Sequence, residues 1–122
     1  MDRFVIEGGV PLEGSVRVGG AKNSALPALA ACLLTPDEVV LHGIPRVRDT
    51  RTMEELLANI GAGIASEPDG TVRVRAEAIA EPEAPYEIVK TMRASSLVLG
   101  PLAARSGRAR VSLPGGCASG LP

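Results

Sequence analysis

The chain has 122 residues, which is enough for one domain with a hydrophobic core. Its net charge is −1 and its basic residues form no run, so the sequence does not predict a surface for a phosphate backbone. Only 2% of its residues are aromatic, which argues against a stacking platform for single-stranded nucleic acid, and nucleic acid is therefore not an expected partner.

The start of the chain, MDRFVIEGG, lacks the basic residues and the apolar stretch of a secretory signal. No apolar run reaches the roughly 18 residues that a membrane span needs, so a cytoplasmic protein without a membrane partner is predicted. In that compartment Cys32 and Cys117 should stay reduced. These two cysteines and the single histidine, His42, do not form a zinc site or a hydrolase catalytic set, and no metal or cofactor is expected.

The first predicted elements are two short strands, over residues 3–8 and 14–20, which a turn at residues 11–14 joins. A helix should follow from about Asn23 to Leu34, since this stretch lacks β-branched residues and stops at Thr35-Pro36-Asp37. The stretch is apolar on nearly all sides. It is therefore expected to be a helix that is buried on every side.

The next predicted elements are a strand over residues 38–45 and an amphipathic helix over residues 49–63. Asp49 or Thr50 is expected to be the N-cap of this helix, and Gly61 its C-cap. Its apolar face should consist of Met53, Leu56, Leu57 and Ile60.

Residues 63–78 predict a β-hairpin that turns at Pro68-Asp69-Gly70. The predicted order is thus β-α-β-α-β-β, and it begins again after a proline-rich connection over residues 81–86. At an offset of 71 residues Lys22 aligns with Arg93, and AKNSALPALAACLL overlays MRASSLVLGPLAAR. Each copy places a cation before an apolar helix and a strand after it, which indicates an internal repeat of two similar units.

Lys22 and Asn23 follow a Gly-Gly turn and open the first predicted helix, where exposed amides, the positive end of the helix dipole and an ammonium suit an anion such as phosphate. The alternative is that Asn23 only caps the helix and Lys22 is solvated. Arg93 repeats the arrangement at the next apolar helix, where its guanidinium could bind a phosphate or pyrophosphate in a bidentate manner. Its alternative is a structural salt bridge with a glutamate such as Glu87.

Cys117 stands in the loop sequence PGGC, whereas Cys32 lies inside an apolar helix and is expected to be a small buried hydrophobe. Two glycines let backbone amides approach the sulfur or a bound anion, and Lys22 or Arg93 nearby could lower the pKa of the thiol. Cys117 is therefore either a reactive nucleophile or proton donor, or a residue that merely fills a loop.

Three stretches, GGAKNSALP, YEIVKTMRASSLVLGPL and VSLPGGC, resemble the N-terminal part of the UDP-N-acetylglucosamine 1-carboxyvinyltransferase family of bacterial enolpyruvyl transferases. They occur in the same order and at consistent spacing, and the similarity runs almost from Met1 to Gly120. The resemblance implies an α/β fold in which each of two inside-out domains is built from β-α-β-α-β-β units around buried helices.

The resemblance also implies an activity and roles for the residues above. Such an enzyme transfers the enolpyruvyl group of phosphoenolpyruvate to the 3-hydroxyl of UDP-N-acetylglucosamine, which begins peptidoglycan precursor synthesis. Lys22 and Asn23 resemble the pair at the phosphoenolpyruvate site, and Arg93 resembles an arginine that contacts the UDP-sugar. Cys117 resembles the proton donor that fosfomycin alkylates.

The family fold further implies how the chain is divided. Residues 1–20 are expected to belong to the other domain of the enzyme, and residues 21–122 to form an incomplete first domain. Within it, one unit would occupy about residues 21–80 and a partial second unit about residues 84–122. The remainder of this domain and the second domain would be its partners.

The resemblance has one departure, because the family continues after the cysteine loop with an Arg-Pro that helps to hold phosphate, whereas Leu121-Pro122 follow Gly120 here. Activity of this chain by itself is therefore not expected. Two other interpretations stay open. One is the related enzyme that acts on shikimate 3-phosphate, although its pattern lacks the PGGC cysteine and the KTMRAS motif, and the other is a non-catalytic fragment or scaffold of the family.

Overall fold

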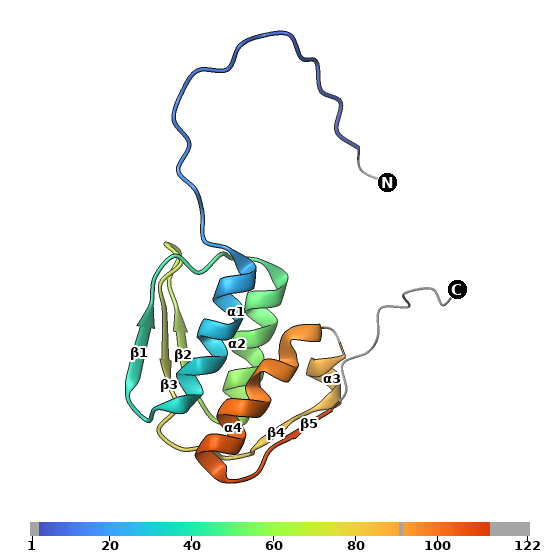
Figure 1. Ribbon diagram of the computed structural model, residues 1–122. Coiled ribbons are helices and arrows are strands. Elements are labelled where there is room, and N and C mark those ends of the chain that lie inside the picture. Colours follow the sequence, from blue (N-terminus) through green and yellow to red (C-terminus); the bar gives the residue numbers. More distant parts are fainter. Residues whose placement is uncertain (1–2, 91, 113–122) are drawn as a thin grey trace, which may run out of the picture.

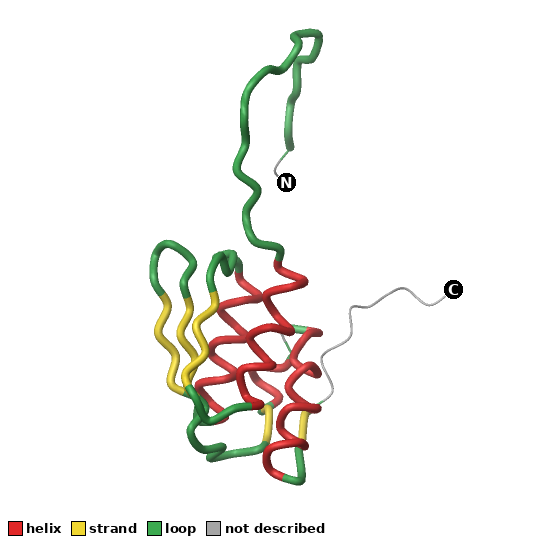
Figure 2. Tube along the Cα trace, turned by 60° about the vertical axis from the view of Figure 1, so that its left-hand side comes forward, coloured by secondary structure: helices red, strands yellow, loops and turns green. Residues whose placement is uncertain are grey.

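The computed structural model describes residues 3–90 and 92–112, with the backbone but not the side chain of Arg93 (Figure 1). A three-stranded sheet lies on one side of a group of helices, and a two-stranded sheet lies at one end of that group (Figure 2). The helices are α1 Lys22–Ala31, η1 Cys32–Leu34, α2 Arg48–Ile60, α3 Tyr86–Val89, η2 Arg93–Val98 and α4 Leu99–Ser106, where η denotes a 3-10 helix. The strands are β1 Glu38–Leu41, β2 Gly63–Ser66, β3 Val72–Arg75, β4 Glu83–Ala84 and β5 Arg110–Val111.

The three-stranded sheet has β3 at its centre and pairs it antiparallel with β1 and with β2. Val72 and Val74 of β3 are buried against the helices, whereas Arg73 and Arg75 are exposed, as strand alternation requires. The predicted hairpin over residues 63–78 is thereby confirmed. One face of this sheet closes the hydrophobic core and the other faces solvent.

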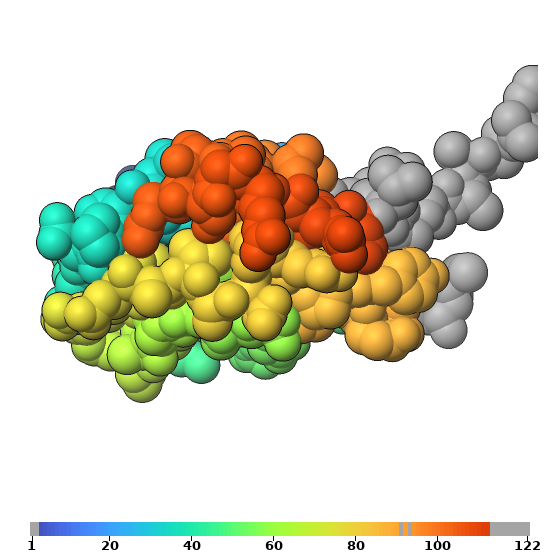
Figure 3. Space-filling view, turned by 90° about the horizontal axis from the view of Figure 1, so that it is seen from below, coloured from blue at the N-terminus to red at the C-terminus, as the bar shows by residue number. Residues whose placement is uncertain are grey.

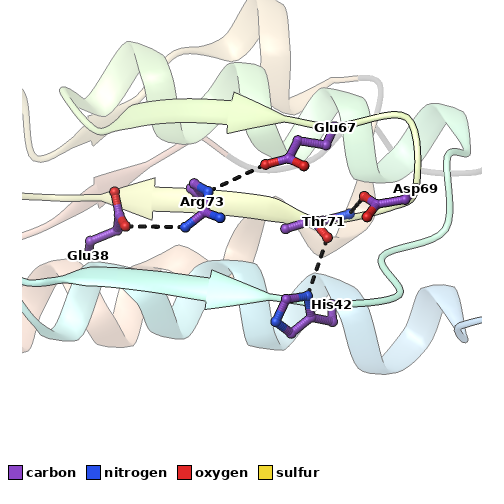
Figure 4. Close-up of polar contacts among 6 residues, drawn as sticks. All are labelled: Glu38, His42, Glu67, Asp69, Thr71 and Arg73. Carbon is purple, nitrogen blue, oxygen red and sulfur yellow. Dashed lines mark hydrogen bonds and ion pairs between the residues drawn. The ribbon is translucent and has the colours of Figure 1, made fainter.

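The solvent face of the sheet carries a ladder of charges that joins β1, β3 and the residue directly after β2 (Figure 4). The Arg73 guanidinium lies 3.5 Å from the Glu38 carboxylate on one side and 3.4 Å from the Glu67 carboxylate on the other. All three side chains are about half exposed, so the ladder favours the register of the strands more than it adds to stability.

The turn of the hairpin is held by its own side chains (Figure 4). The Asp69 carboxylate accepts a hydrogen bond of 2.8 Å from the Thr71 amide, which holds the pKa of Asp69 below its ordinary value. The Thr71 hydroxyl shares a hydrogen bond of 3.3 Å with His42 Nδ1 and so ties the turn to the end of β1. Gly70, with φ at 86°, supplies the left-handed residue that the turn needs.

The first predicted helix is confirmed as α1 continued by η1, but its burial is not as predicted. Ala25, Leu26, Leu29 and Ala30 are buried, whereas Pro27 and Ala31 are exposed and Leu34 is 52% exposed. Within the part of the chain that the structure describes, α1 therefore has one open apolar side. The prediction that this helix is buried on every side was therefore wrong, because no helix or strand among the described residues covers the open side of α1.

The amphipathic helix is confirmed as α2, whose four predicted apolar residues are fully buried. Gly61 ends it in the left-handed conformation, with φ at 118°, as predicted. The prediction of its N-cap was wrong, since Val47 occupies that position. Thr50 lies three residues further on, where its hydroxyl accepts a hydrogen bond from the Val47 amide at 3.3 Å and donates one to the Pro45 carbonyl at 2.7 Å.

The second unit follows the order that the internal repeat predicted. β4 and β5 pair in parallel, and the helical segment α3, η2 and α4 connects them. Arg93 begins η2 as Lys22 begins α1, which agrees with the alignment of the two residues in the repeat. No helix in residues 3–90 and 92–112 is long and apolar enough to cross a membrane.

Arg105 joins the second unit to the first. From the last turn of α4 its guanidinium donates hydrogen bonds to the carbonyls of Leu33 at 2.8 Å and Ala76 at 3.1 Å. These carbonyls belong to the end of η1 and to the residue after β3, where regular structure no longer supplies donors. The surface of α4 accordingly lies against the segment that follows β3 (Figure 3).

The segment before α1 extends away from the rest of the molecule (Figure 1). No strand forms in residues 3–20, so the prediction of two strands there was wrong for this structure. Its apolar side chains, among them Phe4 at 97% and Leu12 at 98% exposure, find no partner strand or core in the described residues. That residues 1–20 belong to another domain stays a prediction.

The Arg105 contacts lead to a stability prediction. Arg105→Met should lower the free energy of unfolding by about 1–3 kcal/mol, because it leaves the carbonyl of the buried Leu33 without a donor. Arg108→Met is the matched control, since Arg108 is exposed and has no ion pair in the described residues. Urea unfolding followed by circular dichroism measures both variants. Equal effects of the two substitutions would show that Arg105 does not join the units.

Candidate functional site

The N-termini of α1 and α2 lie side by side at one end of the molecule (Figure 1). Lys22 is the first residue of α1, and Asp49 is the second residue of α2. The Lys22 ammonium lies 2.8 Å from the Asp49 carboxylate, and both side chains are partly exposed, at 48% and 34%. The charge that the sequence predicted for an anion site thus stands between two helix N-termini, both of which favour negative charge.

Asn23 does not cap α1. The N-cap is Ala21, whose carbonyl accepts hydrogen bonds from the amides of Ser24 and Ala25, and no side chain caps the helix. Asn23 is exposed, and its amide has no hydrogen bond within the part of the chain that the structure describes. The alternative in which Asn23 caps the helix and Lys22 is merely solvated is therefore wrong on both counts.

A shallow, widely open groove of about 350 Å³ lies between α1 and η2. Most of its surface is apolar, and Asn23 contributes an amide side chain to its lining. Its lining residues are Asn23, Leu26, Pro27, Ala94, Ser96 and Leu97. A groove of this kind suits a ligand that has both an apolar face and a group that bonds to an amide.

Three arginines that sequence reasoning did not single out gather at the start of α2. Arg46, Arg48 and Arg51 border a hollow of about 450 Å³ that extends to Glu87. Neither Arg48 nor Arg51 has an ion pair among residues 3–90 and 92–112. The signal was the spacing R-x-R-x-x-R directly before and within the first turn of the helix, which a search for continuous basic runs does not detect.

The structure describes some of the other residues that the sequence singled out, and not others. Cys32 is 2% exposed, as predicted, and burial raises the pKa of its thiol. Arg93 begins η2, but its side chain lies outside what the structure describes. The Glu87 carboxylate, the proposed partner in the alternative for Arg93, pairs with Lys90. Cys117 lies outside the described residues, so its predicted role is not tested.

Comparison with known proteins identifies the class. The family described as EPSP synthase (3-phosphoshikimate 1-carboxyvinyltransferase) matches residues 6–120, nearly the whole chain. The chain belongs to this family of carboxyvinyl transferases.

Relatives with higher similarity carry a more specific name. The chain is 70% identical over 120 residues to the UDP-N-acetylglucosamine 1-carboxyvinyltransferase of Solibacter usitatus, a match that covers 98% of the chain and 28% of that protein. It is 62% identical over 122 residues to the enzyme of the same name from Anaeromyxobacter sp., a match that covers 98% of the chain and 29% of that relative. The chain thus spans less than a third of the length of these relatives, and the predicted resemblance to this family is confirmed.

A solved structure agrees with the fold. The enolpyruvyl transferase NikO from Streptomyces tendae superimposes with a TM-score of 0.71 and 30% sequence identity, over 82% of this chain and 23% of that one. The predicted α/β fold of the enolpyruvyl transferase type is therefore confirmed. The division of the chain into domains and the roles of the individual site residues are not tested by these similarities.

Proposed function

We propose that this chain is part of an enzyme that transfers the enolpyruvyl group of phosphoenolpyruvate to the 3-hydroxyl of UDP-N-acetylglucosamine and releases phosphate. The observation that carries the proposal is the 70% identity, over 98% of the chain, to a relative that is named for this reaction. The substrate names come from that relative, whose length the chain covers only to 28%. The geometry at the N-termini of α1 and α2 supports the proposal, because it offers cations and helix dipoles to a phosphate.

The chemistry divides into two steps. Addition requires a proton at the methylene carbon of phosphoenolpyruvate and a base that takes the proton of the sugar hydroxyl as its oxygen attacks the neighbouring carbon. Elimination then removes a proton from the new methyl group and expels phosphate. Cys117 is proposed as the acid of the first step. Lys22 is proposed to hold the phosphate through both steps, so that negative charge on the leaving group is stabilised. The base of the second step is not assigned to this chain.

The acceptor is proposed to lie in the groove between α1 and η2. Asn23 in its lining could bond to the sugar or to its amide, and the apolar lining, including Leu97, could contact the N-acetyl methyl group. Arg93, which begins η2, is proposed to contact the charged part of the UDP-sugar. On this proposal the donor would lie at the N-terminus of α1 and the acceptor beside it.

The proposed reaction also implies a place in the cell. UDP-N-acetylglucosamine with an enolpyruvyl group is a precursor of peptidoglycan, so the enzyme would act in the cytoplasm and serve cell wall formation, cell shape and division. Fosfomycin, which carries a phosphonate and an epoxide, would bind where phosphoenolpyruvate binds and alkylate Cys117. Both statements rest on the proposed reaction.

Activity is best measured in a full-length chimaera, in which residues 1–120 of this chain replace the matching segment of the Solibacter usitatus relative. The chimaera should release phosphate from phosphoenolpyruvate when UDP-N-acetylglucosamine is present, and not when shikimate 3-phosphate replaces it. Absence of this activity in a folded chimaera, or use of shikimate 3-phosphate instead, would overturn the proposed function.

Within the chimaera, Lys22→Ala should raise KM for phosphoenolpyruvate by about tenfold to a hundredfold, because it removes a charge-assisted contact to the phosphate. KM for the UDP-sugar should change much less. Arg93→Ala should show the opposite selectivity. Steady-state kinetics with each substrate varied in turn measures both variants, and equal losses for both substrates would show that the two roles are assigned wrongly.

The Cys117 assignment predicts selective alkylation. Fosfomycin should modify Cys117 and not Cys32, whose burial raises the pKa of its thiol. Modification should be faster with UDP-N-acetylglucosamine bound than without it. Cys117→Asp should keep turnover and lose sensitivity to the drug, whereas Cys117→Ala should lose most activity. Peptide mass mapping and kinetics measure these outcomes, and full activity of Cys117→Ala would rule out the proton-donor role.

A further inference from the structure

The Lys22 ammonium, the cation at the proposed phosphate site, is held by a carboxylate from another helix. Asp49 Oδ2 lies 2.8 Å from Lys22 Nζ and belongs to the first turn of α2. Such a contact at a site for anions is unexpected, since a carboxylate repels phosphate and reduces the net charge that attracts it. The arrangement therefore calls for a function that outweighs this repulsion.

Three features keep the Asp49 carboxylate in place. It stands at the N-terminus of a helix of 13 residues, where the dipole favours negative charge. The Thr50 hydroxyl fixes the start of that helix through its bonds to the Val47 amide and the Pro45 carbonyl. The packing of α1 on α2 then fixes the position of the carboxylate relative to Lys22.

The Lys22 side chain needs such a partner because it is long and half exposed. A lysine side chain has four rotatable bonds, and without a contact its ammonium would occupy many positions around the helix terminus. An ammonium has three hydrogens, and one contact with Asp49 leaves others free for a phosphate. Arg48, which precedes Asp49 in the first turn of α2, has no ion pair among the described residues, so a second cation at this helix start is not neutralised by a carboxylate there.

We propose that Asp49 is a positioning residue for the transfer reaction: it holds the Lys22 ammonium in the orientation that receives the phosphate of phosphoenolpyruvate. The proposal rests on the proposed function and deepens it, because it assigns to α2 a part in donor binding. Asp49 acts through Lys22 and does not itself bind the phosphate. A carboxylate that only competed with the phosphate for the Lys22 ammonium would have the opposite effect, because its removal would strengthen phosphate binding.

The first test is kinetic and uses the full-length chimaera. Asp49→Ala should raise KM for phosphoenolpyruvate by about tenfold, since a displaced cation binds less well, while KM for UDP-N-acetylglucosamine stays within about twofold. Asp49→Glu should restore at least half of the lost affinity, because it returns a carboxylate within reach of Lys22. Glu55→Gln is the matched control, since it removes an acidic group from the same helix without contacting Lys22, and it should leave both KM values unchanged.

Each of the opposite results overturns the proposal. A fall in KM for phosphoenolpyruvate in Asp49→Ala would mean that Asp49 only competes with the phosphate. A parallel rise of both KM values, without rescue by Asp49→Glu, would mean that the residue only maintains the fold. An unchanged KM would mean that the contact has no part in donor binding.

A second test does not depend on activity and uses the 122-residue chain itself. The chain has only two lysines, Lys22 and Lys90, and both form ion pairs. With ¹⁵N-labelled lysine at low temperature, the ammonium signals of both should be observed in the unchanged chain, because ion pairing slows exchange with water. Asp49→Asn should abolish the Lys22 signal and leave that of Lys90, whose partner is Glu87.

These two tests separate the possible failures. If the unchanged chimaera does not transfer the enolpyruvyl group, the proposed function fails, whatever the state of Lys22. If it does transfer the group but the Lys22 signal persists in Asp49→Asn, Asp49 does not hold the ammonium and the inference fails by itself.

Discussion

The packing of α1 against α2 is the constraint on which the rest of the structure depends. The two helices lie side by side and begin at the same end, which brings their first turns together (Figure 1). Leu29 of α1 and Met53 and Leu57 of α2 are fully buried, and apolar burial of this kind is the main favourable contribution to folding. The three-stranded sheet covers one side of this pair, and Arg105 fastens the second unit to it through the ends of η1 and β3.

This packing also determines where charge gathers. Because both helices start at one end, their unsatisfied amides and positive dipole ends add to the charges of Lys22, Arg48 and Arg51 there. By contrast, the solvent face of the three-stranded sheet carries charges of both signs, which are paired in the ladder around Arg73 (Figure 4). A chain with a net charge of −1 thereby presents a cationic end without being basic overall. An end of this kind attracts anions more strongly than the rest of the surface does.

Much of this arrangement could be predicted from local sequence. The period of Met53, Leu56, Leu57 and Ile60 predicted the buried face of α2, and the glycine at position 61 predicted where that helix ends, because both signals depend on a few neighbouring residues. The N-cap was mispredicted for a different reason. Asp49 and Thr50 are common cap residues, but the Asp49 carboxylate pairs with Lys22 and the Thr50 hydroxyl bonds back to the preceding loop.

Other features depend on parts of the molecule that are distant in sequence. Asp49 and Lys22 meet only because α1 and α2 pack in the same direction, and no local pattern indicates this contact. The strand prediction for residues 3–20 rested on two short strand-like runs and the turn between them, and a strand forms only where a second strand pairs with it. The prediction that α1 is buried on all sides likewise needed elements beyond those that the structure describes.

The central claim is that the paired starts of α1 and α2 form the anion site. It is tested most directly by titrating the ¹⁵N-labelled chain with inorganic phosphate and following its backbone amide signals by NMR. The account predicts that the largest shifts occur at residues 22–24 and in the first turn of α2, and that Lys22→Gln abolishes them. Largest shifts at Arg73 and Arg75 on the outer face of the sheet, with Lys22→Gln unchanged from the original chain, would contradict it.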